Sequence, residues 1–324
     1  MDRISCVGPG RPAAARPVPF RPGRAMMRSV PALVNLDGTL VAPAEARVSV
    51  FDRGFLLGDS VYEVVRTYGE RPFELTAHLA RLARSAERIA MPLRWDAART
   101  TREIDRTLAA AKGGDEPPPG AAPWNVGERY LRIVMTRGTG EIGLDPALAG
   151  APLALVILQP LVGPPLSAYA EGVKALLVAD PRPAGSDPSA KTGAHAPHVL
   201  AVRAARAAGA HEAVLVDAGG RVAEGASSNV FAVLGGRVAT PPLGAGILEG
   251  VTRGLVLALA REAGIPAEER TLPASELEAA DEVFITSTVR EILPVTRLGD
   301  RAVGNGRPGE FTLALHRRFR ERAS

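Results

Sequence analysis

The sequence predicts an α+β fold with two domains, a smaller one over residues 31–161 and a larger one over residues 168–324. Segments with the two-residue period of strands and segments with the 3.6-residue period of helices occur in both halves of the chain. Between the halves, residues 162–167 hold a Gly-Pro-Pro cluster that indicates a linker. Hydrophobic residues make up 46% of the chain and charged residues 23%, the composition of a globular protein.

The N-terminal half is expected to contain two hairpins, two helices and further strands. Residues 32–41 alternate around a polar Asn-Leu-Asp-Gly stretch and predict the first hairpin. Residues 48–73 predict a strand, a glycine-punctuated loop and a second hairpin that turns at Gly69 and Glu70. The remaining predicted elements are a helix over 76–91, a helix from the N-cap Asp96 to Lys112, a surface loop over 113–123, and strands over 130–136 and 153–161.

The C-terminal half is expected to mix short buried strands with helices. Ser275 and Glu278 have the spacing of a capping box at the start of a short helix. The predicted strands cover 173–180, 212–217 and 282–288, with a hairpin over 228–242. The other predicted helices are an alanine-rich one over 198–210, one from Gly250 to Gly264, and one over 309–322.

The basic character of the chain is confined to a leader over residues 1–30. The sequence pI is 9.6, but the leader carries six Arg and one Asp, whereas the rest carries 33 basic and 34 acidic residues. This nearly neutral body argues against a nucleic-acid partner. The leader lacks the apolar core of a secretory signal, so we expect a disordered extension or an upstream start codon, with initiation at Met26 or Met27; a transit peptide is the alternative.

Cysteine usage and hydropathy bear on location and partners. The single cysteine, Cys6, lies in the leader, so the body is expected to hold no disulfide, no reactive thiolate and no Cys-based metal site. This usage suits the reducing cytoplasm, where we expect the protein to reside. No apolar run reaches the roughly 18 residues of a membrane helix, so no membrane partner is expected.

Only three of the 39 basic residues are lysines. Arginine cannot replace lysine in Schiff-base chemistry because its guanidinium stays protonated. Lys112 lies in a Gly-rich loop and Lys174 at a strand entry, whereas Lys191 follows a Pro-rich turn and precedes a helix. A catalytic amine needs an ordered, partly desolvated position that lowers its pKa. Lys191 is therefore the candidate catalytic residue, with simple surface exposure as the alternative.

Three further segments carry groups suited to a phosphorylated pyridine. Glu224, in RVAEGASSNVF, is either a turn acid or a carboxylate that keeps a pyridine nitrogen protonated. The segment 250–254, GVTRG, opens either an ordinary capped helix or one whose N–H groups and dipole bind a phosphate, with a hydroxyl from Thr252. Further donors end a predicted strand at Thr286, Ser287 and Thr288.

Together these segments resemble the class IV, or fold-type IV, aminotransferases, which depend on pyridoxal phosphate. The resemblance covers about residues 32–300 and depends most on Lys191, on the EGxSSN motif that begins 33 residues later, and on the GVTRG helix start. The family includes branched-chain and D-amino-acid aminotransferases and aminodeoxychorismate lyases. The matching segments are FDRGFLLGDSVYEVVRT, HLARLARSAERI, YLRIVMTRG, AKTGAHAPHVLA, HEAVLVDAGGRVAEGASSNVF, ILEGVTRG and EVFITSTVREILPV.

The resemblance implies a two-domain fold-type IV enzyme and a role for each matching residue. Lys191 would carry the cofactor as a Schiff base and move the substrate proton, and Glu224 would be the partner of the pyridine nitrogen. The cofactor phosphate would be bound by Arg81, Val251, Thr252, Ser287 and Thr288. The substrate would be contacted by Tyr62, Tyr130, Arg132 and Val289.

Two positions bear on the substrate. Because strand residues alternate, Tyr130 and Arg132 should share a face, and Arg132 would bind the second carboxylate of glutamate or 2-oxoglutarate; a surface ion pair is the alternative. Many family members have a tyrosine four or five positions after the lysine, in contact with the phenolic oxygen of the cofactor. His195 and Ala196 stand there instead, and His195 either substitutes for the tyrosine or has no role.

The resemblance implies a homodimer that moves an amino group between an amino acid and 2-oxoglutarate by a ping-pong mechanism. The YLR motif at 130–132 favours branched-chain L-amino acids as the substrate. The SVYEV and MTRGT segments favour D-amino acids as the second choice, and an aminodeoxychorismate lyase is the third. A binding protein without turnover would require the loss of a catalytic group, whereas Lys191, Glu224 and Arg81 are all present.

Overall fold

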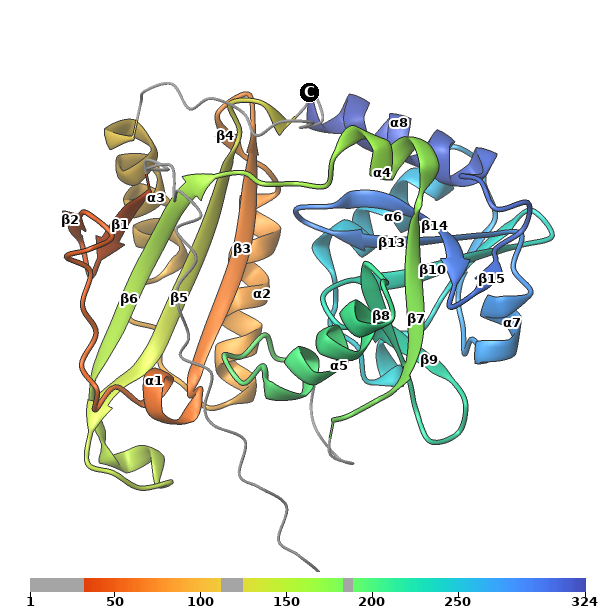
Figure 1. Cartoon of the computed structure of the whole chain (residues 1–324). Helices are drawn as coiled ribbons and strands as arrows, with labels where there is room; N and C mark the ends of the chain where they lie inside the picture. Colours follow the sequence, from red (N-terminus) through yellow and green to blue (C-terminus); the bar gives the residue numbers. More distant parts are fainter. Residues whose placement is uncertain (1–31, 112–124, 183–188) are drawn as a thin grey trace, which may run out of the picture. The chain divides into compact units, whose positions relative to one another are not determined.

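The computed structural model describes residues 32–111, 125–182 and 189–324 (Figure 1). The predictions for the leader, for Lys112 and for the loop over 113–123 lie outside these residues. Two sheets and the helices packed on them confirm the α+β fold class. No helix in the described part of the chain is both long and apolar enough to cross a membrane.

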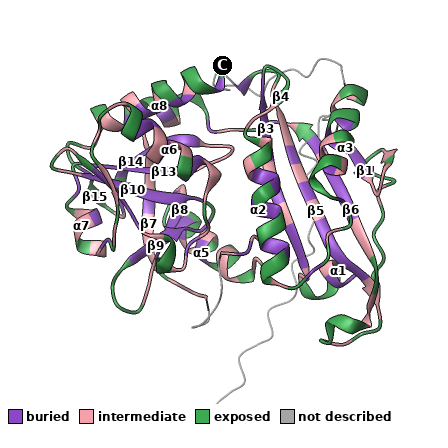
Figure 2. Cartoon of the chain, turned by 180° about the vertical axis from the view of Figure 1, so that it is seen from behind, coloured by how far each residue is buried: buried purple, intermediate pink, exposed green. Residues whose placement is uncertain are grey.

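The N-terminal half builds a six-stranded antiparallel sheet in the order β2-β1-β6-β5-β3-β4. Helices α2 and α3 cover one face of this sheet (Figures 1 and 2). Its strands are β1 (Leu33–Leu36), β2 (Thr39–Val41), β3 (Ser60–Tyr68), β4 (Arg71–Pro72), β5 (Arg129–Gly140) and β6 (Ala149–Pro160). Its helices are α1 (Arg53–Leu57), α2 (Leu75–Arg88), α3 (Ala97–Ala110) and the 3₁₀ helix η2 (Pro146–Leu148).

Alternation along β3 and β5 decides which face of this sheet each side chain takes. Val61 and Leu131 are fully buried in the core beneath α2 and α3. Tyr62 and Arg132, one residue further along each strand, therefore lie on the opposite face and are only partly buried. Figure 2 shows the same division on α2, whose buried residues face the sheet while its outer side is exposed.

The C-terminal half builds a second, mixed sheet in the order β12-β11-β10-β13-β14-β7-β8-β9, with β15 paired to β14. Its pairs β14–β7, β7–β8 and β11–β12 are parallel. The strands are β7 (Val173–Ala179), β8 (Glu212–Val216), β9 (Val222–Gly225), β10 (Asn229–Leu234), β11 (Arg237–Thr240), β12 (Ala267–Glu269), β13 (Glu282–Ser287), β14 (Glu291–Leu298) and β15 (Arg301–Ala302). The helices are α4 (Leu166–Glu171), α5 (Ala196–Ala207), η3 (Leu243–Ala245), α6 (Val251–Glu262), α7 (Ala274–Glu278) and α8 (Glu310–Ala323).

Several local predictions are confirmed in detail. Asp96 caps α3, because its carboxylate accepts the N–H of Arg99 at 2.6 Å. The second hairpin turns at Gly69 and Glu70, which both have positive φ angles. The linker predicted over 162–167 is shorter than expected, because α4 begins at Leu166, directly after Pro165. The exact division into two domains stays a prediction.

Two local predictions are wrong. The strand expected at the start of 48–73 is absent; Val48 and Val50 are exposed, and the chain instead forms α1, which Asp52 caps by accepting the N–H of Gly54. The capping box at Ser275 is also absent. The N-cap of α7 is Pro273, whose fixed φ of −61° sets the start two residues earlier than a cap at Ser275 would, and no side chain caps the helix.

Candidate functional site

The segment that carries Lys191 is docked along strand β3. The carbonyl of Lys191 accepts the N–H of Tyr62 at 3.0 Å, and the N–H of Gly193 donates to the carbonyl of Ser60 at 2.9 Å. The N–H of Lys191 donates to Oγ of Ser85 on α2 at 3.0 Å. A Cβ at Gly193 would collide with the Ser60 side chain, so this close approach requires glycine. The backbone of the candidate lysine is therefore held from two sides, as a catalytic amine requires.

Three side chains surround the ring of Tyr62. The Cζ of Arg132 lies 4.0 Å from the ring centroid and the Nζ of Lys191 lies 4.5 Å from it. The ring of His195 meets the Tyr62 ring edge-on, with centroids 5.0 Å apart. The structure thus brings together an amine that can form a Schiff base and a guanidinium that can bind a carboxylate. Tyr130 lies on the same face of β5 as Arg132, two residues before it, where it pairs with Arg66 of β3.

His195 faces this group as a neutral ring. Burial, together with the positive charges of Arg132 and Lys191, lowers the pKa of His195 to about 4. Its Nε2 is buried and has no hydrogen-bond partner among the described residues, and neither has Nδ1 of His198 one turn of helix later. Buried nitrogens of this kind cost free energy unless a bound group satisfies them.

The carboxylate of Glu224 is buried and held at both oxygens. Oε1 accepts Nη1 of Arg182 at 3.0 Å, and Oε2 accepts the N–H of Leu248 at 3.0 Å. Burial raises the pKa of Glu224 to about 7, although the Leu248 N–H and the charges of Arg182 and Lys191 all act in the opposite direction. Glu224 can therefore gain or lose a proton near neutral pH, according to the charge that lies beside it.

Arg81 is fixed in a buried cluster between α2, β3 and the start of α6. Its Nη1 donates to the carbonyl of Glu249 at 2.9 Å, while Nε and Nη2 donate to the two oxygens of Glu63 at 2.6 and 2.8 Å. Nδ1 of His78 lies 2.8 Å from Oε2 of Glu63. Burial would raise the pKa of Glu63, but Arg81 and His78 together lower it to about 2. Glu63 therefore stays charged and orients Arg81 toward α6.

The N-terminus of α6 carries no side-chain cap. Gly250 is its N-cap residue, Val251 its first helical residue, and Thr252 is buried at the second position. The amide of Asn229 holds the preceding loop through the carbonyl of Leu248 at 3.0 Å. Backbone N–H groups at such a helix start, with an arginine beside them, can bind a phosphate.

The turn between β13 and β14 carries the remaining predicted residues. Ser287 ends β13, and Thr288 and Val289 lie in the turn. The Oγ of Ser287 accepts the N–H of Arg290 at 3.2 Å, which closes the turn. Among the described residues, no group of three or more His, Cys, Asp or Glu is placed to hold a metal ion.

Several residues of this site were not predicted from the sequence. Glu63 lies on the face of β3 opposite Tyr62, and His78 and Arg81 lie three residues apart on α2. The sequence does not show that this strand face and this helix face pack together. Nothing in the sequence indicated a role for Arg182 either, since its contact with Glu224 spans 42 residues.

Known proteins resemble this chain over most of its length. The family model described as "Amino-transferase class IV" matches residues 60–298. A putative branched-chain-amino-acid aminotransferase of Methanocaldococcus jannaschii is 38% identical over 291 residues, which cover 89% of this chain and 95% of that protein. A D-alanine aminotransferase of Bacillus licheniformis is 33% identical over 86% of this chain and 93% of its own.

A solved structure resembles the fold as a whole. It is the branched-chain aminotransferase of the thermophilic archaeon Thermoproteus uzoniensis, solved with norvaline. The TM-score is 0.78 at 30% sequence identity, over 89% of this chain and 93% of that one. The likeness therefore extends through both sheets.

Proposed function

This chain belongs to the class IV aminotransferase family and is a transaminase, and we propose that it uses pyridoxal phosphate to move an amino group between a branched-chain L-amino acid and 2-oxoglutarate. One observation carries the proposal. The amine of Lys191 and the guanidinium of Arg132 both lie within 4.5 Å of the centroid of the Tyr62 ring. An amine for group transfer and a donor fork for a carboxylate are thus placed beside one aromatic wall.

The residues present fit pyridoxal phosphate. A buried carboxyl with a pKa near 7, Glu224, suits a pyridine nitrogen whose proton must be retained. The buried Nε2 of His195, unpartnered among the described residues, suits a bound polar group beside Lys191. Arg81, next to the start of α6, suits the phosphate, with Thr252 and the backbone of Val251. On the other side, Ser287 and Thr288 of the β13–β14 turn would add hydroxyl donors.

Each residue then has one task. Pyridoxal phosphate, when bound, supplies an aldehyde carbon that takes and returns the amino group and a ring that accepts electron density. The amine of Lys191 would move a proton from Cα of the substrate to the carbon that carries the aldehyde of the cofactor. Glu224 would hold negative charge at the ring nitrogen, and Arg132 would orient a substrate carboxylate. The first product would leave before the second substrate binds, so both half-reactions would use this one set of groups in a ping-pong scheme.

The substrate is proposed from the groups around Tyr62. A branched-chain enzyme must bind an apolar side chain in one half-reaction and the second carboxylate of glutamate in the other. The ring of Tyr62 would contact the first, with Val289 nearby in the β13–β14 turn, and Arg132 would bind the second. The relative from Methanocaldococcus jannaschii supports this choice, and so does the likeness to the branched-chain aminotransferase solved with norvaline, an amino acid with an apolar side chain. D-Amino acids are the second candidate, favoured by the 33% identity to a D-alanine aminotransferase.

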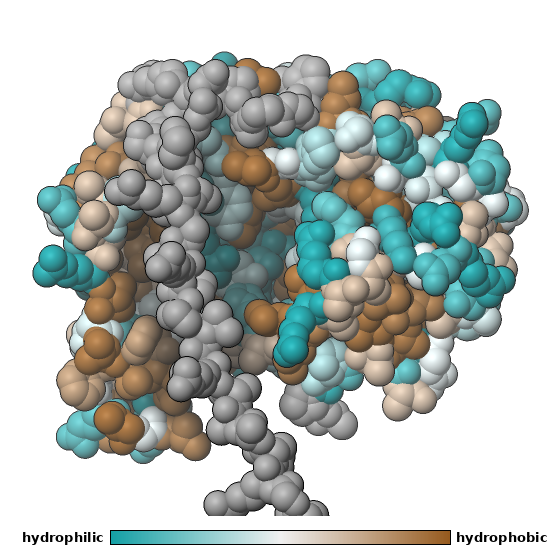
Figure 3. Space-filling model, viewed as in Figure 1, coloured by the Kyte–Doolittle hydropathy of each residue, from teal (hydrophilic) through white to brown (hydrophobic). Residues whose placement is uncertain are grey.

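An exposed apolar patch supports a homodimer. We define it as Val50, Phe51, Phe55, Leu56, Leu57, Ile142 and Leu144, of which Phe55 is 70% and Leu144 82% exposed. Figure 3 shows hydrophobic side chains gathered at this lower end of the six-stranded sheet, around α1. The end of α1 lies beside the segment that carries Lys191, because a Cβ on Gly58 would lie 3.2 Å from the backbone of Ala194. We propose that a second copy of the chain covers it, and that the cysteine-free body works in the cytoplasm.

The proposed function is tested with the purified protein and a panel of amino acids. After loading with pyridoxal phosphate, the visible absorbance of the bound cofactor should be lost on addition of L-leucine, L-valine, L-isoleucine or L-glutamate. Adding 2-oxoglutarate should restore it. Response to D-alanine or D-glutamate alone would overturn the branched-chain assignment in favour of the D-amino-acid one. Light scattering should give twice the monomer mass, and Phe55→Glu should halve it.

A further inference from the structure

Directly after the turn between β13 and β14, the chain has a glutamate where the backbone favours glycine. Ser287 pairs with Glu291, so the three residues Thr288–Arg290 form the turn between the strands. Glu291, the first residue after the turn, has a φ of +57°. A φ of this sign lies in the left-handed region, which glycine takes without steric cost and which other residues adopt rarely. A glutamate there implies that its side chain offsets the backbone strain.

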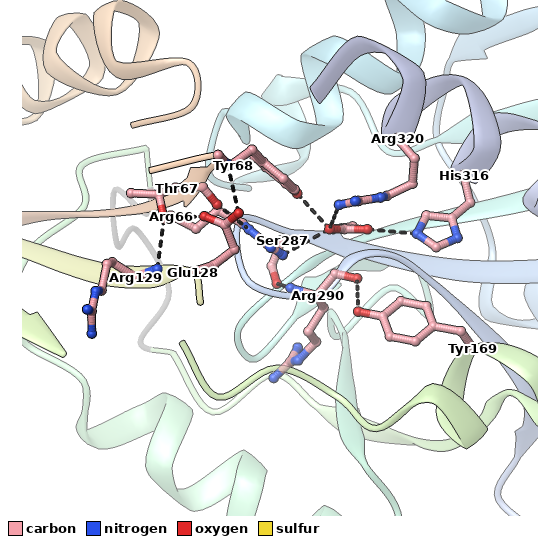
Figure 4. Close-up of polar contacts among 12 residues, drawn as sticks. Arg66, Thr67, Tyr68, Glu128, Arg129, Tyr169, Ser287, Arg290, His316 and Arg320 are labelled. Atoms are coloured by element: carbon pink, nitrogen blue, oxygen red, sulfur yellow. Dashed lines mark hydrogen bonds and ion pairs between the residues drawn. The ribbon is translucent and has the colours of Figure 1, made fainter. Parts of the chain in front are cut away.

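The carboxylate of Glu291 is a fully buried junction of three elements. Its Oε1 accepts Nη1 of Arg66 at 2.9 Å and the hydroxyl of Tyr68 at 2.6 Å, both from β3. From α8, Nη1 of Arg320 donates to Oε1 at 3.0 Å and Nε2 of His316 lies 2.8 Å from Oε2. Figure 4 shows Tyr68, His316 and Arg320 converging on one point. Burial would raise the pKa of this carboxyl, but these partners hold it below its ordinary value.

The residue before it anchors the turn on the other side. Nη1 of Arg290 donates to Oε2 of Glu212 at 2.5 Å, and Nη2 donates to Oγ of Ser227 at 2.8 Å. Its carbonyl accepts the hydroxyl of Tyr169 at 3.2 Å. Figure 4 shows the guanidinium of Arg290 pointing away from Arg320. The turn is thus fixed by ionic contacts in two opposite directions.

Residues of strand β3 hold both groups of proposed phosphate ligands in place. Through Glu63 it orients Arg81 toward the start of α6. Through Arg66, three residues later, it binds Glu291 at the base of the turn that carries Thr288. The two sets of phosphate donors come from different parts of the chain, yet each is held by a buried ion pair to one strand.

We propose that Glu291 is a positioning residue, whose buried carboxylate holds the Thr288–Arg290 turn against β3 and α8 so that the donors of the turn meet the cofactor phosphate. The inference rests on the proposed function, since it requires a phosphate at this turn. Glu291 itself is fully buried and bonded to β3 and α8, so it would act on the phosphate only through the turn. Its loss should weaken binding of the phosphate specifically, while the rest of the cofactor site is unchanged.

The test compares pyridoxamine phosphate with pyridoxamine, which lacks the phosphate. Both bind without a covalent bond to Lys191. The dissociation constant of pyridoxamine divided by that of pyridoxamine phosphate, measured on the apoprotein, isolates the phosphate contribution. We expect Glu291→Gln and Glu291→Gly to reduce that ratio by about tenfold, the equivalent of one charge-assisted hydrogen bond. Glycine relaxes the backbone at φ +57° but removes the anchor, so it separates strain from positioning. Tyr68→Phe, which removes one donor only, should have a smaller effect of the same sign.

Glu282 provides the matched control. It is a buried carboxylate at the other end of β13, and it also ties a strand to α8, through the N–H groups of Phe311 and Thr312 at 3.0 and 2.8 Å. Glu282→Gln should lower the melting temperature without changing the ratio. An unchanged ratio in the Glu291 and Tyr68 variants overturns the inference, as does an equal fall in Glu282→Gln. Failure of the unmutated protein to bind either compound overturns the proposed function instead.

Discussion

Nη1 of Arg182 donates to Oε1 of Glu224 at 3.0 Å, while Nε and Nη2 of the same guanidinium bind the carboxylate of Asp180 at 2.7–3.0 Å. One cation thus serves two acids, and only one of them, Glu224, has a pKa raised by burial to about 7. The pKa of Asp180 is lowered: burial would raise it, but the hydrogen bonds and charge of Arg182 prevail. Arg182 therefore helps to decide whether Glu224 is charged at neutral pH.

Replacing Arg182 with Gln should raise the pKa of Glu224 further, because the cation that favours its charged form is lost. The pH midpoint of the leucine half-reaction should move upward by about one unit. Stopped-flow absorbance of the bound cofactor from about pH 6 to 9 measures this shift. Arg182→Lys, which keeps the charge, should show a smaller one. Superimposable pH profiles for all three proteins would exclude a role for Arg182 in the protonation of Glu224.

Replacing Glu224 with Gln should leave the cofactor bound but slow the half-reaction, by roughly a hundredfold, because a neutral amide cannot hold the pyridine proton. The change also has a pH signature in the apoprotein. The carboxyl has an ordinary pKa of 4.5 and a folded pKa of about 7, so the folded state binds the extra proton between these values. The free energy of unfolding must then fall as pH rises from about 4.5 to 7. Thermal melts at about pH 5 and pH 8 should show that this loss is smaller in Glu224→Gln. A half-reaction rate close to that of the unmutated enzyme would show that Glu224 does not hold the pyridine proton.

Replacing Lys191 with Ala should abolish the visible absorbance of the bound cofactor, because no other lysine of the described chain is docked against Tyr62. Borohydride treatment followed by mass spectrometry should find the cofactor attached at Lys191 in the unmutated protein and nowhere in the variant. Lys174→Ala is the control, since Lys174 pairs with the exposed Asp300 at 3.1 Å and should be dispensable. A trapped adduct that persists in Lys191→Ala would move the assignment to another lysine.

Replacing Arg132 with Ala should weaken the glutamate half-reaction far more than the leucine one. A charge-assisted hydrogen bond is worth roughly 1.5–3 kcal/mol, or about ten- to a hundredfold in kcat/KM. Leucine has no second carboxylate and should lose less. Arg132→Lys should recover only part of the glutamate rate, because an ammonium cannot bind a carboxylate through two parallel hydrogen bonds. Equal losses of kcat/KM with glutamate and leucine would show that Arg132 does not bind the second carboxylate.

Local features of the site can be predicted from the sequence alone. Lys191 stands out because only three lysines exist and the other two lie at a loop and a strand entry. The start of α6 at Gly250 and the cap at Asp96 depend on residues within one helical turn, so their signals are contiguous. The shared face of Tyr130 and Arg132 follows from the strand period along β5, with Leu131 buried on the opposite face.

Only the tertiary structure decided which charges meet. The contact of Arg81 with the carbonyl of Glu249 spans 168 residues, and that of Arg66 with Glu291 spans 225. Nothing in the sequence alone singles out Glu63 or Glu291. Hydrogen bonding within a turn and side-chain period along an element are set by neighbouring residues. The pairing of buried charges is set by how the two sheets and α8 pack, because burial makes each unpaired charge too costly to retain.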